Sequence, residues 1–197
     1  MGYKVNAWTA YRRVDQAPDG LRFHATRQYQ PAKLPALWFN LGCKQASPES
    51  AFTVLQDLGA VRFWPDEGTP YHRDIVLLPW QETIADLGRV ANLWTPADGT
   101  DESRLRHDPM PETAALIAQR LASVVRNGLG IAVDGLRPVI TWKTLEGFLW
   151  LSAAEAVRER HRFKQCRHCK TWFRVQRADA LFCSASCRNF REAPTNG

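Results

Sequence analysis

The sequence predicts an α+β fold with a mixed α/β N-terminal region, a helical middle and a C-terminal treble-clef-like zinc finger. Short β-like runs alternate with turn signals in the first third of the chain, and helical spacings of apolar residues follow. Two close cysteine pairs lie near the C-terminus. We therefore divide the chain into an α+β domain (1–110), a helical region packing on it (111–163) and a four-cysteine zinc finger (164–197).

The N-terminal region begins with a predicted antiparallel sheet. Residues 3–11 and 21–29 are β-like, and the sequence Ala-Pro-Asp-Gly at 17–20 between them is a turn signal. Residues 37–41 form another short apolar run. We expect these segments to be strands of one small sheet.

A capped helix is predicted next, because Ser47 can cap it, a proline follows in the first turn and Gly59 can end it. With 45% hydrophobic residues and eight tryptophans, the chain can bury a substantial core beneath such helices. The expected elements of this stretch are a helix over 48–58, strands over 60–64 and 74–78, and a helix over 79–93.

The middle of the chain changes composition between residues 95 and 111, where Pro, Asp, Gly, Thr and Ser accumulate and predict an exposed loop. One apolar face then repeats at helical spacing, and a later helix has Thr141 as its expected cap. The expected elements are a helix over 111–127, a hairpin of 131–133 with 136–140, and a helix from 141 to 162 that ends in the basic run 158–162.

The clearest motif is the C-terminal cysteine pattern C-x2-C-x13-C-x3-C. Two close pairs separated by about a dozen residues can bring four thiolates onto one tetrahedral Zn²⁺ ion. The first pair suits a zinc knuckle, with hairpin strands over 171–175 and 180–182, and the second suits a helix over 184–191. The predicted ligands are Cys166, Cys169, Cys183 and Cys187.

Other chemistries for these cysteines are two disulfides, a redox C-x-x-C motif or an iron–sulfur cluster, and His161 or His168 could replace a ligand. Zinc is favoured because the pairs are spaced for it and no βαβ redox setting surrounds the first pair. Four cysteines close the coordination shell, so the predicted site is structural. Three aromatic residues should form a small apolar cluster beneath the metal: Phe173, Phe182 and Phe190.

The basic charge of the chain is confined to this end. Residues 158–191 carry ten Lys or Arg against two acids, whereas residues 1–157 carry a net charge of −1. Four thiolates with one Zn²⁺ would lower the local charge by about 2, which leaves the region clearly basic. Phosphate neutralisation by such cations supplies most non-specific affinity for nucleic acids.

The cysteine module resembles the bacterial CGNR-type zinc finger. The resemblance lies in Cys-x-x-Cys-x-x-x-Phe from Cys166 and in Arg-Ala-Asp-Ala-Leu-Phe-Cys-Ser from Arg177, with a looser similarity in the helix that leads into the finger. It implies a family of stress-related transcription regulators in which an N-terminal ABATE domain precedes a DNA-binding finger. The N-terminal region would then sense a signal or oligomerise.

The predicted function is therefore a nucleic-acid-binding zinc finger protein, most simply a DNA-binding transcriptional regulator. The expected contacts to phosphates or the groove are Lys170, Arg174, Arg177, Arg188 and Arg191. His168 and Trp172 could stack or pack. The alternative is a zinc-stabilised adaptor that binds a protein partner, as an accessory factor of a defence or toxin–antitoxin type system. The basic surface would then only keep the module soluble, and Trp172 would pack on the preceding helix.

An enzyme is not expected. A treble-clef nuclease needs a metal-binding constellation of His and Asn around the finger, and only Asn189 and Asn196 follow Cys187, with no histidine. Upstream, His24, His72 and His107 are scattered and belong to no catalytic motif. Seven further tryptophans could line a ligand pocket, but core packing explains them as well: Trp8, Trp38, Trp64, Trp80, Trp94, Trp142 and Trp150.

The cysteine count also suggests a compartment. Five cysteines, four of them crowded into the last 32 residues, are not distributed like a secreted disulfide framework. Cys43 has no partner in sequence and is expected to be a small buried residue. No apolar run of membrane-spanning length is present, so the sequence predicts a cytoplasmic protein without a membrane partner.

Overall fold

A computed structural model describes residues 8–34, 36–63, 65–66, 68–96, 102–105, 110–134, 137–142 and 144–190. The elements in chain order are β1 (Trp8–Ala17), β2 (Gly20–Tyr29), η1 (Pro31–Lys33), α1 (Leu37–Gly42), α2 (Pro48–Leu58), β3 (Pro70–Tyr71), α3 (Arg73–Ala91), β4 (Trp94–Pro96), β5 (Glu102–Leu105), α4 (Pro111–Gly128), β6 (Leu129–Asp134), β7 (Arg137–Trp142), α5 (Leu145–Arg158), β8 (Phe163–Gln165), β9 (Trp172–Arg174) and α6 (Ala185–Asn189).

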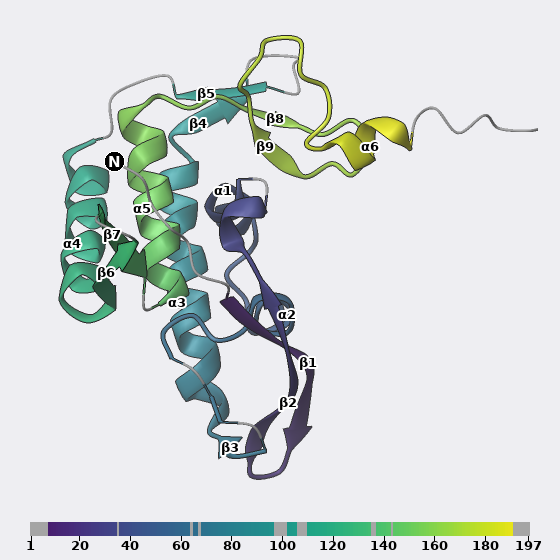
Figure 1. The fold of residues 1–197 in the computed structure, drawn as a ribbon, viewed down its shortest axis with the longest axis vertical. Coiled ribbons are helices and arrows are strands. Elements are labelled where there is room, and N and C mark those ends of the chain that lie inside the picture. The colour runs from purple at the N-terminus through teal and green to yellow at the C-terminus, as the bar shows by residue number, and fades with distance from the viewer. Residues whose placement is uncertain are drawn as a thin grey trace, which may run out of the picture.

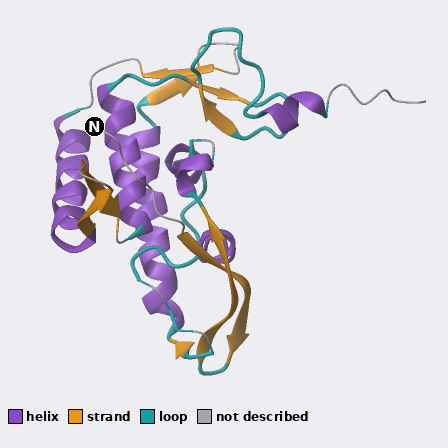
Figure 2. Cartoon of the chain, in the orientation of Figure 1, coloured by secondary structure: helices purple, strands orange, loops and turns teal. Residues whose placement is uncertain are grey.

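The helices α3, α4 and α5 run side by side, with the β1–β2 hairpin beyond one end and a second sheet with α6 at the other (Figures 1 and 2). All the strand pairs are antiparallel, in sheets of order β1-β2-β3, β4-β5-β8-β9 and β6-β7. The predicted mixture of helices and small antiparallel sheets is confirmed. We call residues 8–158 the body and residues 163–190 the metal module.

The N-terminal hairpin turns where the sequence predicts it. The register runs from Trp8 opposite Tyr29 to Ala17 opposite Gly20. Gly20 has φ 137°, and a Cβ there would lie 2.3 Å from the Tyr71 carbonyl oxygen, so both backbone conformation and space require glycine. The first strand covers 8–17 rather than 3–11, and residues 3–7 lie outside the described part of the chain.

Two predicted strands of the body are helical instead. Residues 37–41 belong to α1, which packs against α3 and α5. Residues 74–78 open α3, which continues through Pro79. The proline lacks the N–H that would bond to the Ile75 carbonyl, so the helix continues with one backbone hydrogen bond fewer at this point. Residues 60–63 form bends and coil rather than the predicted strand, and Trp64 is not described.

The helix over 48–58 is confirmed, with the Ser47 hydroxyl accepting a hydrogen bond from the Ser50 N–H at 3.2 Å. The helix over 111–127 and the hairpin after it are also confirmed. The last long helix begins later than predicted, because β7 extends to residue 142 in its pairing with β6. Thr144 rather than Thr141 caps α5 by accepting from the Gly147 N–H at 3.2 Å.

The predicted exposed loop over 95–111 contains two strands. β4 pairs with β5, and β5 pairs with β8 at the start of the metal module. Lys164 on β8 lies 3.5 Å from the Glu102 carboxylate on β5, an ion pair across this junction. The metal module therefore shares a sheet with the body.

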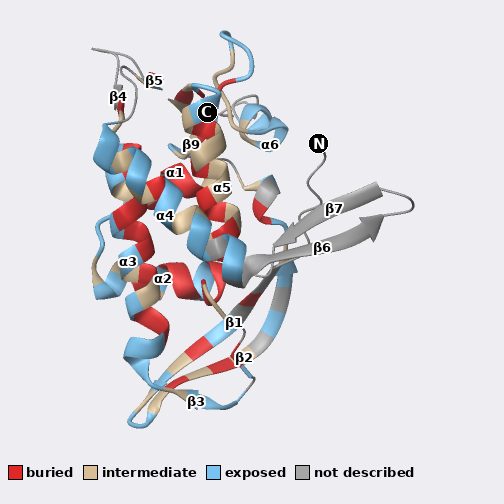
Figure 3. Cartoon of the chain, turned by 90° about the vertical axis from the view of Figure 1, so that its left-hand side faces the viewer, coloured by how far each residue is buried: buried red, intermediate tan, exposed pale blue. Residues whose placement is uncertain are grey.

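One apolar core runs through the body and reaches β8 (Figure 3). Among the seven tryptophans for which the sequence suggested core packing, the four whose burial the structure describes are all buried: Trp38, Trp80, Trp94 and Trp150. Cys43 is exposed, contrary to its predicted burial. Within the described part of the chain, the helices are all too short or too polar to cross a lipid bilayer.

Candidate metal centre

The four C-terminal cysteines come together in space. Their sulfur atoms all lie within 4.8 Å of one another, with Cys183 Sγ 3.6 Å from Cys169 Sγ and 3.5 Å from Cys187 Sγ. A disulfide needs about 2.05 Å, which excludes S–S bonds. Four sulfurs around an ion with metal–sulfur bonds of about 2.3 Å would be about 3.8 Å apart. The cluster therefore has the dimensions of a site that can hold a metal ion.

Short backbone hydrogen bonds position the first pair. The Cys166 N–H donates to the Thr171 carbonyl and the Lys170 N–H to the Cys166 carbonyl, both at 2.9 Å. Lys170 has φ 59°, which closes this tight turn between β8 and β9. A knuckle thus projects both thiols to one side, as the spacing of the pair predicts.

The second pair is held at the start of α6. The Ser184 hydroxyl caps the helix by accepting from the Cys187 N–H at 3.2 Å. The Arg167 N–H donates to the Leu181 carbonyl at 3.1 Å, and the Cys183 N–H points to Cys166 Sγ at 3.5 Å. These contacts tie the two cysteine pairs together.

The electrostatics of the cluster favour a cation. Burial raises the pKa of Cys166, but the backbone N–H groups of Cys169, Cys183 and His168 outweigh it and lower the pKa to about 6. Burial and the neighbouring thiols of Cys187, Cys169 and Cys166 raise the pKa of Cys183. The Cys166 thiol therefore ionises readily, whereas ionising Cys183 as well would place negative charges side by side. A bound cation would offset the repulsion between the thiolates.

The two histidines named as possible ligands do not join the cluster. Among the described residues, only the cysteines form such a group. The His168 ring stacks on Phe190 with centroids 5.0 Å apart, and His161 is buried near Phe163. The cysteines alone supply the donors.

The apolar cluster predicted beneath the metal does not form as a unit. Phe173 is buried and Phe182 is half-buried, but Phe190 is 70% exposed. The predicted strand over 180–182 is also absent, since β9 pairs with β8, which precedes the first cysteine, and not with the segment that follows. The module instead uses the body as its apolar support.

Two contacts fasten the module to α1. The Asn40 side chain donates to the Trp172 carbonyl and accepts from the Trp172 N–H, both at 2.9 Å. Phe39 stacks on Phe163 with centroids 4.2 Å apart and meets Trp172 edge-on at 5.5 Å. Trp172 therefore packs on α1 of the body and is half-buried.

The predicted cations fall into two groups. Lys170 and Arg188 directly follow the ligands Cys169 and Cys187, so they lie at the metal end of the module, and both are exposed. The second group lines a cleft between module and body and consists of Arg174 and Arg177, the latter paired with Asp179 at 2.9 Å. Arg191 lies outside the described residues.

The residues that sequence reasoning missed are those of the cleft. Lys33 on η1, Ser152 and Glu155 on α5, and His161 after α5 line the same cleft only in the folded chain. No spacing along the sequence marks them as a set.

Neither a family model, nor a curated protein, nor a solved structure matches the chain. Four clustered cysteines occur in many metal-binding modules and do not identify the CGNR-type family. The functional case consequently depends on the geometry and charge of the module itself.

Proposed function

We propose that the metal module binds one structural Zn²⁺ ion and contacts DNA with its exposed basic end. Zinc fits a closed set of four thiolate donors at tetrahedral spacing better than metals that prefer oxygen ligands. Bound zinc would cross-link the knuckle to α6. No coordination position would remain for a substrate, so the ion's role would be to fold the module.

The observation that carries the DNA proposal is the surface at the metal end. Phe190 is 70% exposed and stacks on His168 with an angle of 18° between the rings. Exposed cations adjoin this pair in sequence at Arg167, Lys170 and Arg188. Cations that neutralise phosphates next to an aromatic surface that can stack on a base are the usual elements of nucleic-acid binding.

The short length of α6 limits how many bases the module can contact. Its five residues span about 7.5 Å, roughly one and a half turns, so few side chains could reach base edges in a major groove. We therefore expect phosphate contacts to dominate and sequence preference to be weak for this module alone. A regulator of transcription, as the CGNR resemblance implies, would gain specificity from a second copy or from the body.

The test is fluorescence anisotropy of a labelled duplex with the zinc-loaded chain between about 50 and 200 mM salt. Arg188→Glu and Lys170→Glu should each weaken binding and flatten the dependence of log K on log salt by about one unit. Arg12→Glu is the matched control, because it makes the same charge change at an exposed residue of β1, a strand that lies far from α6 (Figure 1). Binding that ignores salt, or that Arg12→Glu weakens equally, would refute the proposal.

A protein-binding adaptor is the second candidate, and the exposure of Phe190 favours it. Large exposed aromatics are typical anchors of protein interfaces. In that case Phe190→Ala should abolish capture of the partner, and Arg188→Glu should have little effect. For the DNA function, both variants should weaken binding, and the loss in Arg188→Glu should shrink as salt rises.

A further inference from the structure

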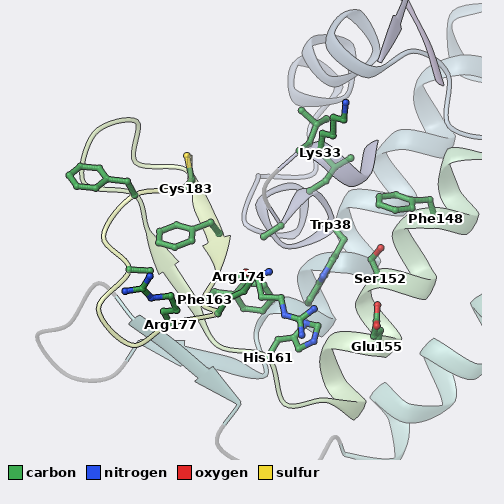
Figure 4. Close-up of a pocket in the computed structure, with 17 residues that line it drawn as sticks. Lys33, Trp38, Phe148, Ser152, Glu155, His161, Phe163, Arg174, Arg177 and Cys183 are labelled. Carbon is green, nitrogen blue, oxygen red and sulfur yellow. The ribbon is translucent and has the colours of Figure 1, made fainter. Parts of the chain in front are cut away.

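A cleft of about 560 Å³ lies between the metal module and the body (Figure 4). One wall comes from η1 and α1, another from α5, and the third from β8, β9 and the segment up to Cys183. Cavities that bind small molecules have volumes of about 300 to 1,000 Å³. The cleft is therefore large enough for an organic molecule with one or two rings.

The lining combines apolar walls with a few polar groups. Leu34, Phe148 and Phe173 provide apolar surface. The cations outnumber the acids, with Lys33, Arg174 and Arg177 against Glu155. Arg177 is already paired with Asp179, whereas Arg174 makes no ion pair with another described residue.

His161 gives this cleft an unsatisfied polar group. The residue is 9% exposed, and its Nε2 atom is buried without a hydrogen-bond partner among the described residues. A buried polar atom without a hydrogen-bond partner destabilises a folded protein and is uncommon. His161 lines the cleft beside Arg174, and a bound molecule that displaces the flexible Arg174 side chain could reach Nε2 and supply the missing partner.

Arg174 and His161 lie close together in this cleft (Figure 4). Burial lowers the pKa of His161, and the Arg174 guanidinium lowers it further. A neutral imidazole can carry its proton on Nε2 and donate it, and the guanidinium offers several donors with a full charge. Together they form a donor pair beside an apolar wall. Ser152 and Glu155 lie on the α5 wall.

We propose that this cleft binds a small organic anion, a carboxylate or similar acid carried on an aromatic or branched apolar body. Arg174 and His161 bind the acidic group, and the apolar walls hold the rest of the molecule. The excess of cations over Glu155 selects against amines and neutral analogues. The binding step itself does not depend on whether the module contacts DNA.

The location of the cleft gives the anion a regulatory consequence, which rests on the proposed function. Its walls belong to both the body and the metal module, so a bound molecule would bridge them. Bridging would restrict how the basic end of the module is presented to DNA. An anion in the cleft would also remove the charge of Arg174 from the surface available to phosphates.

The experiment is isothermal titration calorimetry of the zinc-loaded full chain with 2-naphthoate, compared with 2-naphthamide and 2-naphthylmethylamine. Naphthoate should bind about tenfold more tightly than the amide, because only the acid forms charge-assisted hydrogen bonds. The amine should bind more weakly still. Equal affinity for acid and amide, or no naphthoate binding up to about 5 mM, would overturn the proposal.

Variants locate the site. Arg174→Gln should weaken naphthoate about tenfold and the amide less than about twofold, and His161→Phe should weaken naphthoate about fivefold. Ser152→Trp should abolish binding of all three probes by filling the cleft. Arg158→Gln is the control, since Arg158 is an exposed cation at the end of α5 that does not line the cleft. An equal effect of Arg158→Gln and Arg174→Gln would overturn the site.

Two further variants distinguish loss of the anion site from misfolding and from loss of DNA binding. If Arg174→Gln loses its zinc or its native circular dichroism, Lys33→Gln replaces it as the test, because it removes another cation of the lining from η1, outside the metal module. It should weaken naphthoate more than the amide. Arg188→Glu should leave the naphthoate affinity unchanged while it weakens DNA. Failure to bind DNA would thus refute the proposed function alone, and failure of the acid-to-amide ratio would refute the anion site alone.

Discussion

The body and the metal module are stabilised in different ways. In the body, large side chains such as Trp80, Trp150 and Leu149 are fully buried in one core. The metal module has few buried apolar residues beyond β8, chiefly Phe173 and Val175, and four cysteines gathered at one point. The body can fold by hydrophobic burial, whereas the module needs a cross-link and the support of α1. We therefore expect different changes to unfold the body and the metal module.

The largest effect should follow removal of the proposed zinc ion. In comparable peptides, zinc supplies on the order of 10 kcal/mol of folding free energy at neutral pH. Chelation or Cys166→Ser should therefore unfold residues 166–190, and hydrogen exchange there should become fast while α2, α3 and α5 stay protected. Hydrogen–deuterium exchange with mass spectrometry measures both regions at once.

Cys43→Ser is the matched control for that experiment, because Cys43 is an exposed cysteine outside the cluster. It should leave zinc content and protection unchanged. If chelation instead unfolded the body along with the module, the two parts would be one cooperative unit and the comparison would fail.

The next largest effect should come from a substitution that destabilises the body. Trp80→Ala should lower the free energy of unfolding by about 3 to 5 kcal/mol, because the indole is fully buried and donates to the Gly59 carbonyl at 2.9 Å. Urea denaturation measures the loss, and zinc content should stay at one ion per folded chain. Ile75→Ala on the same helix is the control, since Ile75 is 59% exposed and should cost less than about 0.5 kcal/mol.

The same contrast explains which parts of the fold could be predicted from sequence. Local signals were sufficient where neighbours in sequence decide the structure: the cap at Ser47, the turn ending at Gly20 and the cysteine pairs. The predicted strand over 37–41 was wrong, because α1 packs on α3 and α5, and its aromatics contact Trp94 and Phe163, which are all distant in sequence. Thr144 rather than Thr141 caps α5, because Thr141 belongs to β7 and pairs with Gly130 of β6.

The cysteine cluster and the cleft differ in the same way in how far the sequence could predict them. The four predicted cysteine ligands are brought together, because their order along the chain already contains the geometry of a knuckle and a helix start. The cleft could not be predicted, because Lys33, Ser152 and His161 meet through packing of three separate segments. The β5–β8 pairing was missed for a similar reason, since each strand is too short to show an alternating pattern.

A smaller effect tests the joint between the two parts. Asn40→Ala removes both hydrogen bonds to Trp172 and leaves a partly buried N–H and C=O unpaired, which should cost about 1 to 3 kcal/mol. Exchange should quicken at residues 172–175 while the protection of α2 changes little. Asn92→Ala is the control, because Asn92 is exposed at the end of α3. Uniformly faster exchange across the chain would show that Asn40 stabilises the body itself.

The smallest expected effect is a pH dependence from His161. Burial and Arg174 lower its pKa in the folded chain, although Glu155 and Glu159 oppose them, so the unfolded chain binds the proton more readily. Stability from this group should be complete above the ordinary histidine pKa of about 6.5 and fall as pH drops below it towards the folded value. The free energy of unfolding by urea at several pH values between about 7 and 5 measures this.

His161→Gln isolates that contribution, because glutamine keeps a polar group near the Nε2 position but does not titrate. The cysteine cluster also responds to acid, but it is common to both proteins, so the difference between their curves reports His161 alone. The wild type should lose more stability than the variant as pH falls. Parallel curves would mean that His161 reaches water, and the unsatisfied Nε2 that marks the anion cleft would then already be hydrated.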